Sequence, residues 1–272
     1  MTGRWTVALA LLCAAAMQAQ SPADRRSAGY PAYERANQLF TAKKYQESMN
    51  ALDEALGKDP NLVPALTLRS KLAMAINRFD VARKDLERAI AAAPTSSYAR
   101  FLYGFQFYRQ NEIPAAIAAL EKARQLNPRD APTALYLGLA KESLGNTSAA
   151  LMLYRDAIRL EVAAGQLHID TLMTCARLLL VLGEFDEEER LLNRAVKIAP
   201  NARDPHFEAC RLWLKKGDPA RAAKEGEIAL GLSGDATDRQ VHYLLVQSYQ
   251  ALGRDPDAAR HAAAVHALGE GK

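Results

Sequence analysis

The chain has 272 residues, a formal net charge of +4 and 24% charged residues, with acids and bases interleaved. It contains no basic block of the kind that binds nucleic acid, so we expect no nucleic-acid partner. The length alone allows one or two globular domains.

Residues 1–19 have the features of a secretory signal peptide. Arg4 precedes the apolar run Trp5–Ala16, which is too short to span a bilayer. Small residues before Gln20 suit cleavage after Ala19. We therefore predict export and no stable membrane insertion after cleavage. An uncleaved anchor is the open alternative.

Lipidation at Cys13 is a second alternative, although Leu12 stands where lipid-modified exports have a small residue. The polar residues 20–28, which include Pro and Ser, predict a flexible leader.

A 34-residue period follows the leader, read from Pro60, Pro94 and Pro128. The stretch Tyr98–Pro128 shows one copy most clearly. It has an apolar helix pattern, a polar turn at Gln110–Glu112 and a second helix pattern. When this proline is numbered 32, position 8 is small in six copies, position 20 is mostly small and position 27 is alanine in six copies. Small residues at positions 8 and 20 would let the two helices of a repeat approach closely.

This pattern resembles the tetratricopeptide repeat family, whose signature spans 34 residues. The third copy matches through Tyr103, Gly104, Phe107, Ala116 and Pro128, with Arg100 in place of the signature Trp. The resemblance covers residues 29–272 and implies an all-α, right-handed α-solenoid of about seven stacked helix-turn-helix repeats. We number them repeats 1 to 7: 29–62, 63–96, 97–130, 131–164, 169–202, 203–236 and 239–272.

The register shifts twice along the array. Four extra residues fall around Gly165–His168, which is close to one helical turn. We therefore predict that the second helix of repeat 4 is about one turn longer and that Gly165 ends it in a left-handed conformation. Two further residues, Thr237 and Asp238, are inserted before repeat 7. The acidic run Asp186–Glu189 reads as a solvated helix start, where the helix dipole favours acids.

No catalytic or metal-binding constellation is visible. The histidines, read as surface or packing residues, lack the spacing of a helical zinc site, and no phosphate loop or nucleophile motif occurs. They are His168, His206, His242, His261 and His266. We expect no enzyme activity and no cofactor. Cys175 and Cys210 are either two buried thiols or a disulfide between repeats 5 and 6.

The resemblance implies that positions 2, 5, 9, 12 and 13 of each repeat line an inner, concave face. In repeat 3, helical spacing independently aligns Tyr98, Phe101, Phe105 and Tyr108 in one stripe. Such an apolar patch is typical of an interaction site, and aromatic anchors dominate binding energy. The alternative is that these rings pack only against neighbouring helices. The candidate partner-binding residues are Tyr33, Phe40, Lys71, Tyr98, Phe101, Phe105, Tyr108, Arg109, Arg177 and Arg211.

Arg177 and Arg211 both occupy position 9 and are candidates to hold a carboxylate, or are part of a mixed solvated face. Some members of the family grip a C-terminal carboxylate with a five-residue clamp. Only Asn37 fits that clamp here, so we do not expect it.

These observations predict a non-catalytic scaffold that binds a protein or peptide segment in its groove. The alternative is a structural subunit of an envelope complex that docks through its ends or convex face. An export signal on this kind of repeat implies a bacterial protein that is periplasmic or secreted.

Overall fold

The computed structural model describes residues 24–232 and 239–270. The predicted signal peptide, Cys13, and the insertion Thr237–Asp238 lie outside the described residues. The last residues of the predicted flexible leader are held in place. Asp24–Arg26 form a short 3-10 helix, η1, and the Ser27 hydroxyl hydrogen-bonds to a carboxylate oxygen of Asp59 at 2.5 Å.

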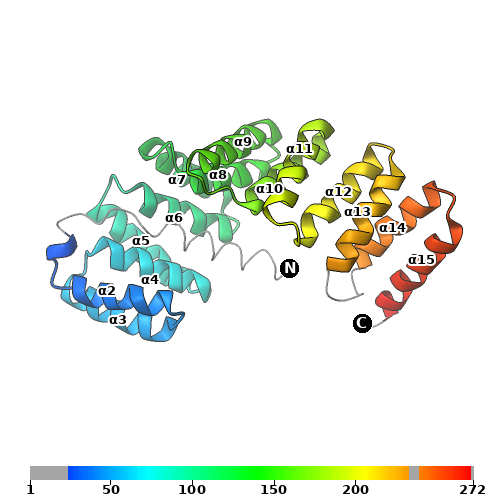
Figure 1. Ribbon diagram of the computed structural model, residues 1–272. Coiled ribbons are helices and arrows are strands. Elements are labelled where there is room, and N and C mark those ends of the chain that lie inside the picture. Colours follow the sequence, from blue (N-terminus) through cyan, green and yellow to red (C-terminus); the bar gives the residue numbers. More distant parts are fainter. Residues whose placement is uncertain (1–23, 233–238, 271–272) are drawn as a thin grey trace. The chain divides into compact units, whose positions relative to one another are not determined.

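The described residues form α-helices in antiparallel pairs, one pair for each predicted repeat, and contain no strand (Figure 1). The chain divides into two compact units, with the boundary between Leu160 and Glu161. The N-terminal unit holds α2 (Tyr30–Thr41), α3 (Tyr45–Lys58), α4 (Val63–Ala75), α5 (Phe79–Ala92), α6 (Ser97–Arg109), α7 (Ile113–Leu126), α8 (Ala131–Ser143) and most of α9 (Thr147–Ala163). The C-terminal unit holds α10 (Ile169–Leu182), α11 (Phe185–Ile198), α12 (Arg203–Lys215), α13 (Pro219–Leu232), α14 (Arg239–Ala251) and α15 (Asp255–Glu270).

The turn inside each pair contains one residue with a positive φ angle, between 59° and 77°. Glycine adopts this left-handed conformation without the clash that a Cβ atom causes, and asparagine tolerates it better than most residues. Successive turn residues are 34 apart except at the two predicted register shifts, so the backbone follows the sequence period. The turn residues are Lys43, Asn77, Asn111, Gly145, Gly183, Gly217 and Gly253.

The small residues at position 8 allow the close approach that the sequence predicts. A Cβ atom on Gly104 would lie 2.6 Å from Cγ of Leu120, and one on Gly138 would lie 2.6 Å from Cε1 of Tyr154. Both distances are far shorter than van der Waals contact. In repeats 3 and 4 the second helix therefore packs directly on the backbone of the first.

The helix α9 is longer than the other second helices of the N-terminal unit, at 17 residues against 14, and Gly165 follows it with φ of +69°. Both features were predicted from the four-residue shift. The Glu161 carboxylate also accepts hydrogen bonds from the His168 backbone N–H at 3.0 Å and the Thr171 hydroxyl at 2.7 Å. These bonds cap the start of α10, so Glu161 fixes the segment that carries the extra residues.

Candidate functional site

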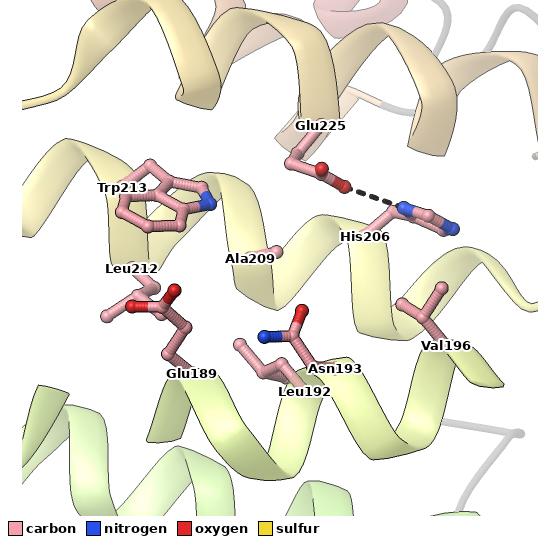
Figure 2. A pocket seen from close by; sticks show the side chains of 9 residues that line it. All are labelled: Glu189, Leu192, Asn193, Val196, His206, Ala209, Leu212, Trp213 and Glu225. Atoms are coloured by element: carbon pink, nitrogen blue, oxygen red, sulfur yellow. Dashed lines mark hydrogen bonds and ion pairs between the residues drawn. The ribbon is translucent and has the colours of Figure 1, made fainter. Parts of the chain in front are cut away.

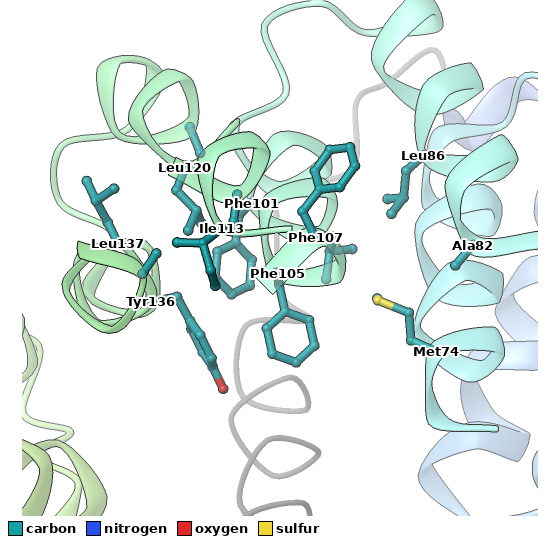
Figure 3. Packing of buried hydrophobic residues seen from close by; sticks show 14 of the residues in the cluster. Met74, Ala82, Leu86, Phe101, Phe105, Phe107, Ile113, Leu120, Tyr136 and Leu137 are labelled. Carbon is teal, nitrogen blue, oxygen red and sulfur yellow. The ribbon is translucent and has the colours of Figure 1, made fainter. Parts of the chain in front are cut away.

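The predicted aromatic stripe of repeat 3 is continuous in the structure. Along α6, ring centroids lie 6.3 Å apart between Tyr98 and Phe101 and 6.2 Å apart between Phe101 and Phe105. Tyr136 of α8 meets the stripe from the next repeat, with its centroid 4.8 Å from that of Phe105 and 5.9 Å from that of Tyr108 (Figure 3). These offset and edge-on contacts are the arrangements that aromatic rings prefer.

The two phenylalanines and the two flanking tyrosines differ in burial. Phe101 and Phe105 are 3% and 1% exposed and belong to the hydrophobic core, whereas Tyr98 and Tyr108 are half-buried. Phe101 and Phe105 therefore form the floor of the stripe, and the two tyrosines form its accessible part. Tyr136 belongs to the same cluster and was missed from the sequence, because its position 6 is not one that the family pattern assigns to the inner face.

Arg109, predicted to contact a partner, holds the preceding repeat. Its Nη1 donates to the Met74 carbonyl at 2.7 Å and its Nη2 donates to Oδ1 of Asn77 at 3.0 Å. Its guanidinium lies 5.0 Å from the centroid of the Phe79 ring. Burial lowers the pKa of this guanidinium. These contacts fix the left-handed turn at Asn77, so Arg109 joins repeats 2 and 3.

The predicted residues of repeats 1 and 2 form a smaller group. Tyr33 and Lys71 are buried, and Phe40 is half-buried. The Lys71 ammonium lies 5.0 Å from the centroid of the Phe40 ring, a cation–π contact. Lys71 and Phe40 therefore pack on each other, and the partly accessible Phe40 ring is the member of the group that a ligand could reach most directly.

Arg177 and Arg211 do hold a carboxylate, but it belongs to the chain itself. Nε of Arg177 donates to Glu208 Oε1 at 2.9 Å, and Nη1 of Arg211 donates to Glu208 Oε2 at 2.6 Å. The Glu208 carboxylate is buried, so the two arginines supply the charge that its burial requires. Nearby, burial raises the pKa of Asp170, with the negative charge of Asp204 adding to the effect.

The prediction that the acidic run Asp186–Glu189 is solvated is wrong for Glu188. It is fully buried, and neither carboxylate oxygen has a hydrogen-bond partner among the described residues. Burial, with the negative charge of Glu208, raises the pKa of Glu188 to about 8 against the opposing charges of Arg211 and Lys216. The signal was present in the repeat register, because Glu188 occupies position 20, which is alanine or serine in the other repeats.

A cavity of about 90 Å³ lies between α11, α12 and α13 (Figure 2). His206 and Glu225 close one side through an Nδ1 to Oε2 contact of 2.7 Å, and Trp213 stands at the other. The Trp213 ring is already covered by the Lys216 ammonium at 5.2 Å and the Arg221 guanidinium at 4.5 Å. The cavity is several-fold smaller than pockets for small-molecule ligands, so it does not qualify as a substrate site.

Cys175 and Cys210 are buried thiols that are not joined in a disulfide, which decides between the two alternatives for this pair. Within residues 24–232 and 239–270, no group of three or more His, Cys, Asp and Glu side chains is placed to hold a metal ion. No helix in the same ranges has both the length and the apolar character needed to cross a membrane.

The comparison with protein families agrees with the turn spacing and the close packing at position 8. Residues 67–131 and 106–167 match the family described as tetratricopeptide repeat. Residues 67–167 are therefore tetratricopeptide repeats, and the chain has the fold of a tetratricopeptide repeat protein. Such proteins are in general non-catalytic modules that bind protein or peptide partners.

Among curated proteins, the chain is 21% identical over 202 residues to anaphase-promoting complex subunit 3 of Schizosaccharomyces pombe, covering 74% of this chain and 30% of that protein. It is 36% identical over 124 residues to tyrosine recombinase XerC of Mycobacterium sp. strain KMS, covering 43% and 38%. The chain thus spans about a third of the length of these curated relatives. Their activities and assemblies are therefore not assigned to it.

Solved tetratricopeptide repeat structures confirm the all-helical solenoid class. PilF of Pseudomonas aeruginosa is 16% identical with a TM-score of 0.67, covering 84% of this chain and 97% of that one. YrrB, described as a TPR protein with an unusual peptide-binding site, is 16% identical with a TM-score of 0.58, covering 74% and 98%. At this identity the likeness establishes the fold alone.

Proposed function

We propose that this tetratricopeptide repeat protein is a non-catalytic adaptor that binds an extended or helical segment of a partner protein on the inner face of repeats 1 to 4. The observation that carries the proposal is the aromatic stripe of α6 and α8. Its half-buried tyrosines, Tyr98 and Tyr108, stand over a rigid floor of Phe101, Phe105 and Tyr136.

Rigid aromatic side chains give a large contact area with little loss of conformational entropy when a partner binds. Here the floor rings are held by one another, so the accessible tyrosines are already positioned before binding. A preorganised surface of this kind raises affinity, because little ordering is left for the binding step. The peptide-binding site described for YrrB adds support at the level of the fold.

The setting of the adaptor is part of the proposal. An apolar N-terminal run preceded by Arg4 supports export, and export of this kind of repeat places the adaptor in the bacterial periplasm or outside the cell. Mass spectrometry of the mature protein from the native host tests this directly. Cleavage after Ala19 is expected, and recovery of the intact N-terminus from the cytoplasm would overturn the export proposal.

A structural subunit that docks through another surface is the second candidate. The specific observation in its favour is that position 14 carries exposed apolar side chains in several repeats, of which Ile76 at 61% and Leu144 at 59% are the most exposed. They are the C-cap residues of α4 and α8, next to the turns of repeats 2 and 4. Exposed apolar side chains at corresponding positions suit a docking surface, although single ones are common on any protein.

One capture experiment separates the two candidates. The parent, an inner-face variant (Tyr98→Ser with Tyr108→Ser) and an edge variant (Ile76→Ser with Leu144→Ser) are immobilised and incubated with cell-envelope extract. Circular dichroism first has to show equal helicity. Loss of a captured protein in the inner-face variant alone supports the adaptor, and loss in the edge variant alone supports the structural subunit. Retention by both variants contradicts both candidates.

A further inference from the structure

Two buried histidines face each other in repeat 7. His242 of α14 and His261 of α15 are 6% and 3% exposed, and their Nδ1 atoms lie 2.8 Å apart. Their ring centroids are 5.1 Å apart. A contact this short between two ring nitrogens is a hydrogen bond only if one Nδ1 carries a hydrogen and the other offers a lone pair.

The contacts of His261 Nε2 are compatible with either neutral tautomer of this ring. Nε2 lies 3.1 Å from Glu227 Oε1, which can only accept, and 3.2 Å from Arg260 Nη2, which can only donate. In either case one ring donates through its Nδ1–H to the bare Nδ1 of the other, so the two neutral rings are opposite tautomers.

Charged and titratable groups surround the pair from three helices. Glu227 comes from α13. Tyr249 of α14 stacks on His261 with centroids 5.6 Å apart, and its hydroxyl donates to Glu227 at 2.9 Å. Arg260 of α15 places Nη2 3.2 Å from Nε2 of His261 and 3.5 Å from Glu227 Oε1, with Asp257 beyond it. The network therefore links α13, α14 and α15.

We propose that the His242–His261 pair is a proton-sensitive latch that holds α15 against α14 and releases it when both imidazoles are protonated. The first added proton is compatible with the latch, because an imidazolium of one ring still donates from Nδ1 to the bare Nδ1 of the neutral ring. The second puts a hydrogen on both facing nitrogens and two positive charges side by side in a buried site. Neither nitrogen can then accept, and the two rings separate.

Release would uncover the small core of the last repeat, which includes Val241, Leu245, Tyr249 and Ala258. The other repeats in the described chain show no contact between two histidine rings, so the response is confined to repeat 7. The inference is independent of what the inner face of repeats 1 to 4 binds.

The direction of the pH response follows from linkage. Burial is the main cause that lowers the pKa of His261, with the charges of Arg260 and protonated His242 acting the same way against Glu227. A base with a lowered pKa in the folded state binds fewer protons than it does in the unfolded state. Its contribution to stability is present above the ordinary value of about 6.5 and is lost as pH falls below it.

Hydrogen–deuterium exchange of the full chain between pH 7.5 and 5.0 tests the latch, with rates corrected for intrinsic exchange. Peptides from α15 are expected to lose protection by about tenfold per pH unit below about 6.5. Peptides from α6 provide the internal reference. Protection of α15 that does not change across this range would overturn the proposal.

Two substitutions on the same helix sharpen the test. His261→Gln removes the titrating ring, so the acid response of α15 is expected to disappear. His266→Gln alters an exposed histidine and should respond as the parent does. An acid response that survives in His261→Gln would overturn the latch.

If His261→Gln does not fold, NMR titration of the imidazoles of the parent protein tests the proposal instead. We expect opposite neutral tautomers for His242 and His261 and a His261 midpoint below 6.5. Identical tautomers, or ordinary midpoints for both rings, would contradict the proposal.

Discussion

Arg69 of α4 holds both carboxylate oxygens of Asp85 of α5, with Nε 2.8 Å from Oδ2 and Nη2 2.6 Å from Oδ1. Asp85 is almost fully buried, and its hydrogen bonds raise the pKa of the Arg69 guanidinium above its usual value. The same guanidinium also donates from Nη1 to Asp53 at 2.8 Å, but Asp53 is exposed. One arginine thus has a buried and an exposed carboxylate partner.

Replacing the buried partner is expected to destabilise the protein far more than replacing the exposed one. Asp85→Ala should cost about 3–5 kcal/mol, because it leaves a partly buried guanidinium without its main counter-charge. Asp53→Ala should cost about 0–1 kcal/mol, as exposed ion pairs do. Urea unfolding followed by circular dichroism measures both, and equal losses would show that burial does not set the strength of this pair.

Two glycine-to-alanine changes are expected to act in opposite directions. Gly104→Ala places a Cβ atom 2.6 Å from Cγ of Leu120 and 3.1 Å from its backbone nitrogen, so overpacking should cost about 1–3 kcal/mol. Gly57→Ala lies in α3 with no atom within 4 Å of the new Cβ and should stabilise by about 0.5–1 kcal/mol. Thermal unfolding provides the comparison. A neutral Gly104→Ala would mean that the helices can move apart without loss.

The buried Glu188 is expected to make the protein less stable as the pH rises from about 4.5 to about 8. Its pKa of about 8 in the folded protein lies above the ordinary value of about 4.5, so the folded state holds the proton more tightly than the unfolded state. The resulting stabilisation is complete below about pH 4.5 and is lost as pH rises through about 8, by at most about 1.4 kcal/mol per pH unit.

Glu188→Gln should remove this slope, since an amide does not titrate. Glu189→Gln is the matched control, because Glu189 is the next residue and already pairs with Lys216 at 2.8 Å. Urea midpoints between pH 5 and 9 give the slopes. If Glu188→Gln retains the slope of the parent while Glu189→Gln loses it, Glu188 is not the titrating group.

Neither Cys175 nor Cys210 is expected to react in the folded protein. Both thiols are buried, and burial raises the pKa of Cys210 to about 12, so its reactive thiolate is scarce at neutral pH. Alkylation with iodoacetamide followed by mass spectrometry should label neither Cys175 nor Cys210 in native buffer and both in urea without reductant. Labelling in urea only after reduction would instead reveal a disulfide.

Much of the fold could be predicted from the spacing of a few residues. Pro60, Pro94 and Pro128 set the period, and the four-residue shift at Gly165 predicted the longer α9. These predictions succeeded because the contacts that build a helical repeat are local in sequence. Each turn and each contact between the two helices depends on residues at fixed spacings. The register also indicates the burial of Glu188, because it occupies position 20, where the other repeats have alanine or serine. The prediction of a solvated residue followed the charge of its side chain instead.

The candidate site was only partly predictable. Helical spacing placed Tyr98, Phe101, Phe105 and Tyr108 in one stripe. Which of these rings are buried also depends on Tyr136 of the next repeat, which packs against them. Arg109, Arg177 and Arg211 were predicted to contact a partner, and the structure adds that each also makes hydrogen bonds within the chain. The sequence does not reveal the contacts of Arg109 with Met74 and of Arg177 with Glu208, because they join residues 35 and 31 apart whose side-chain directions depend on how the repeats stack.

The sequence by itself determined the period, the helices, their turns and the positions where helices touch, because each follows from steric rules that act within about one repeat. Only the tertiary structure decided which polar groups are buried and what they meet. Glu188, the Arg69–Asp85 pair and the His242–His261 pair all arise where side chains from different helices enter the same low-dielectric space, in which the energy of a charge depends on every neighbour at once.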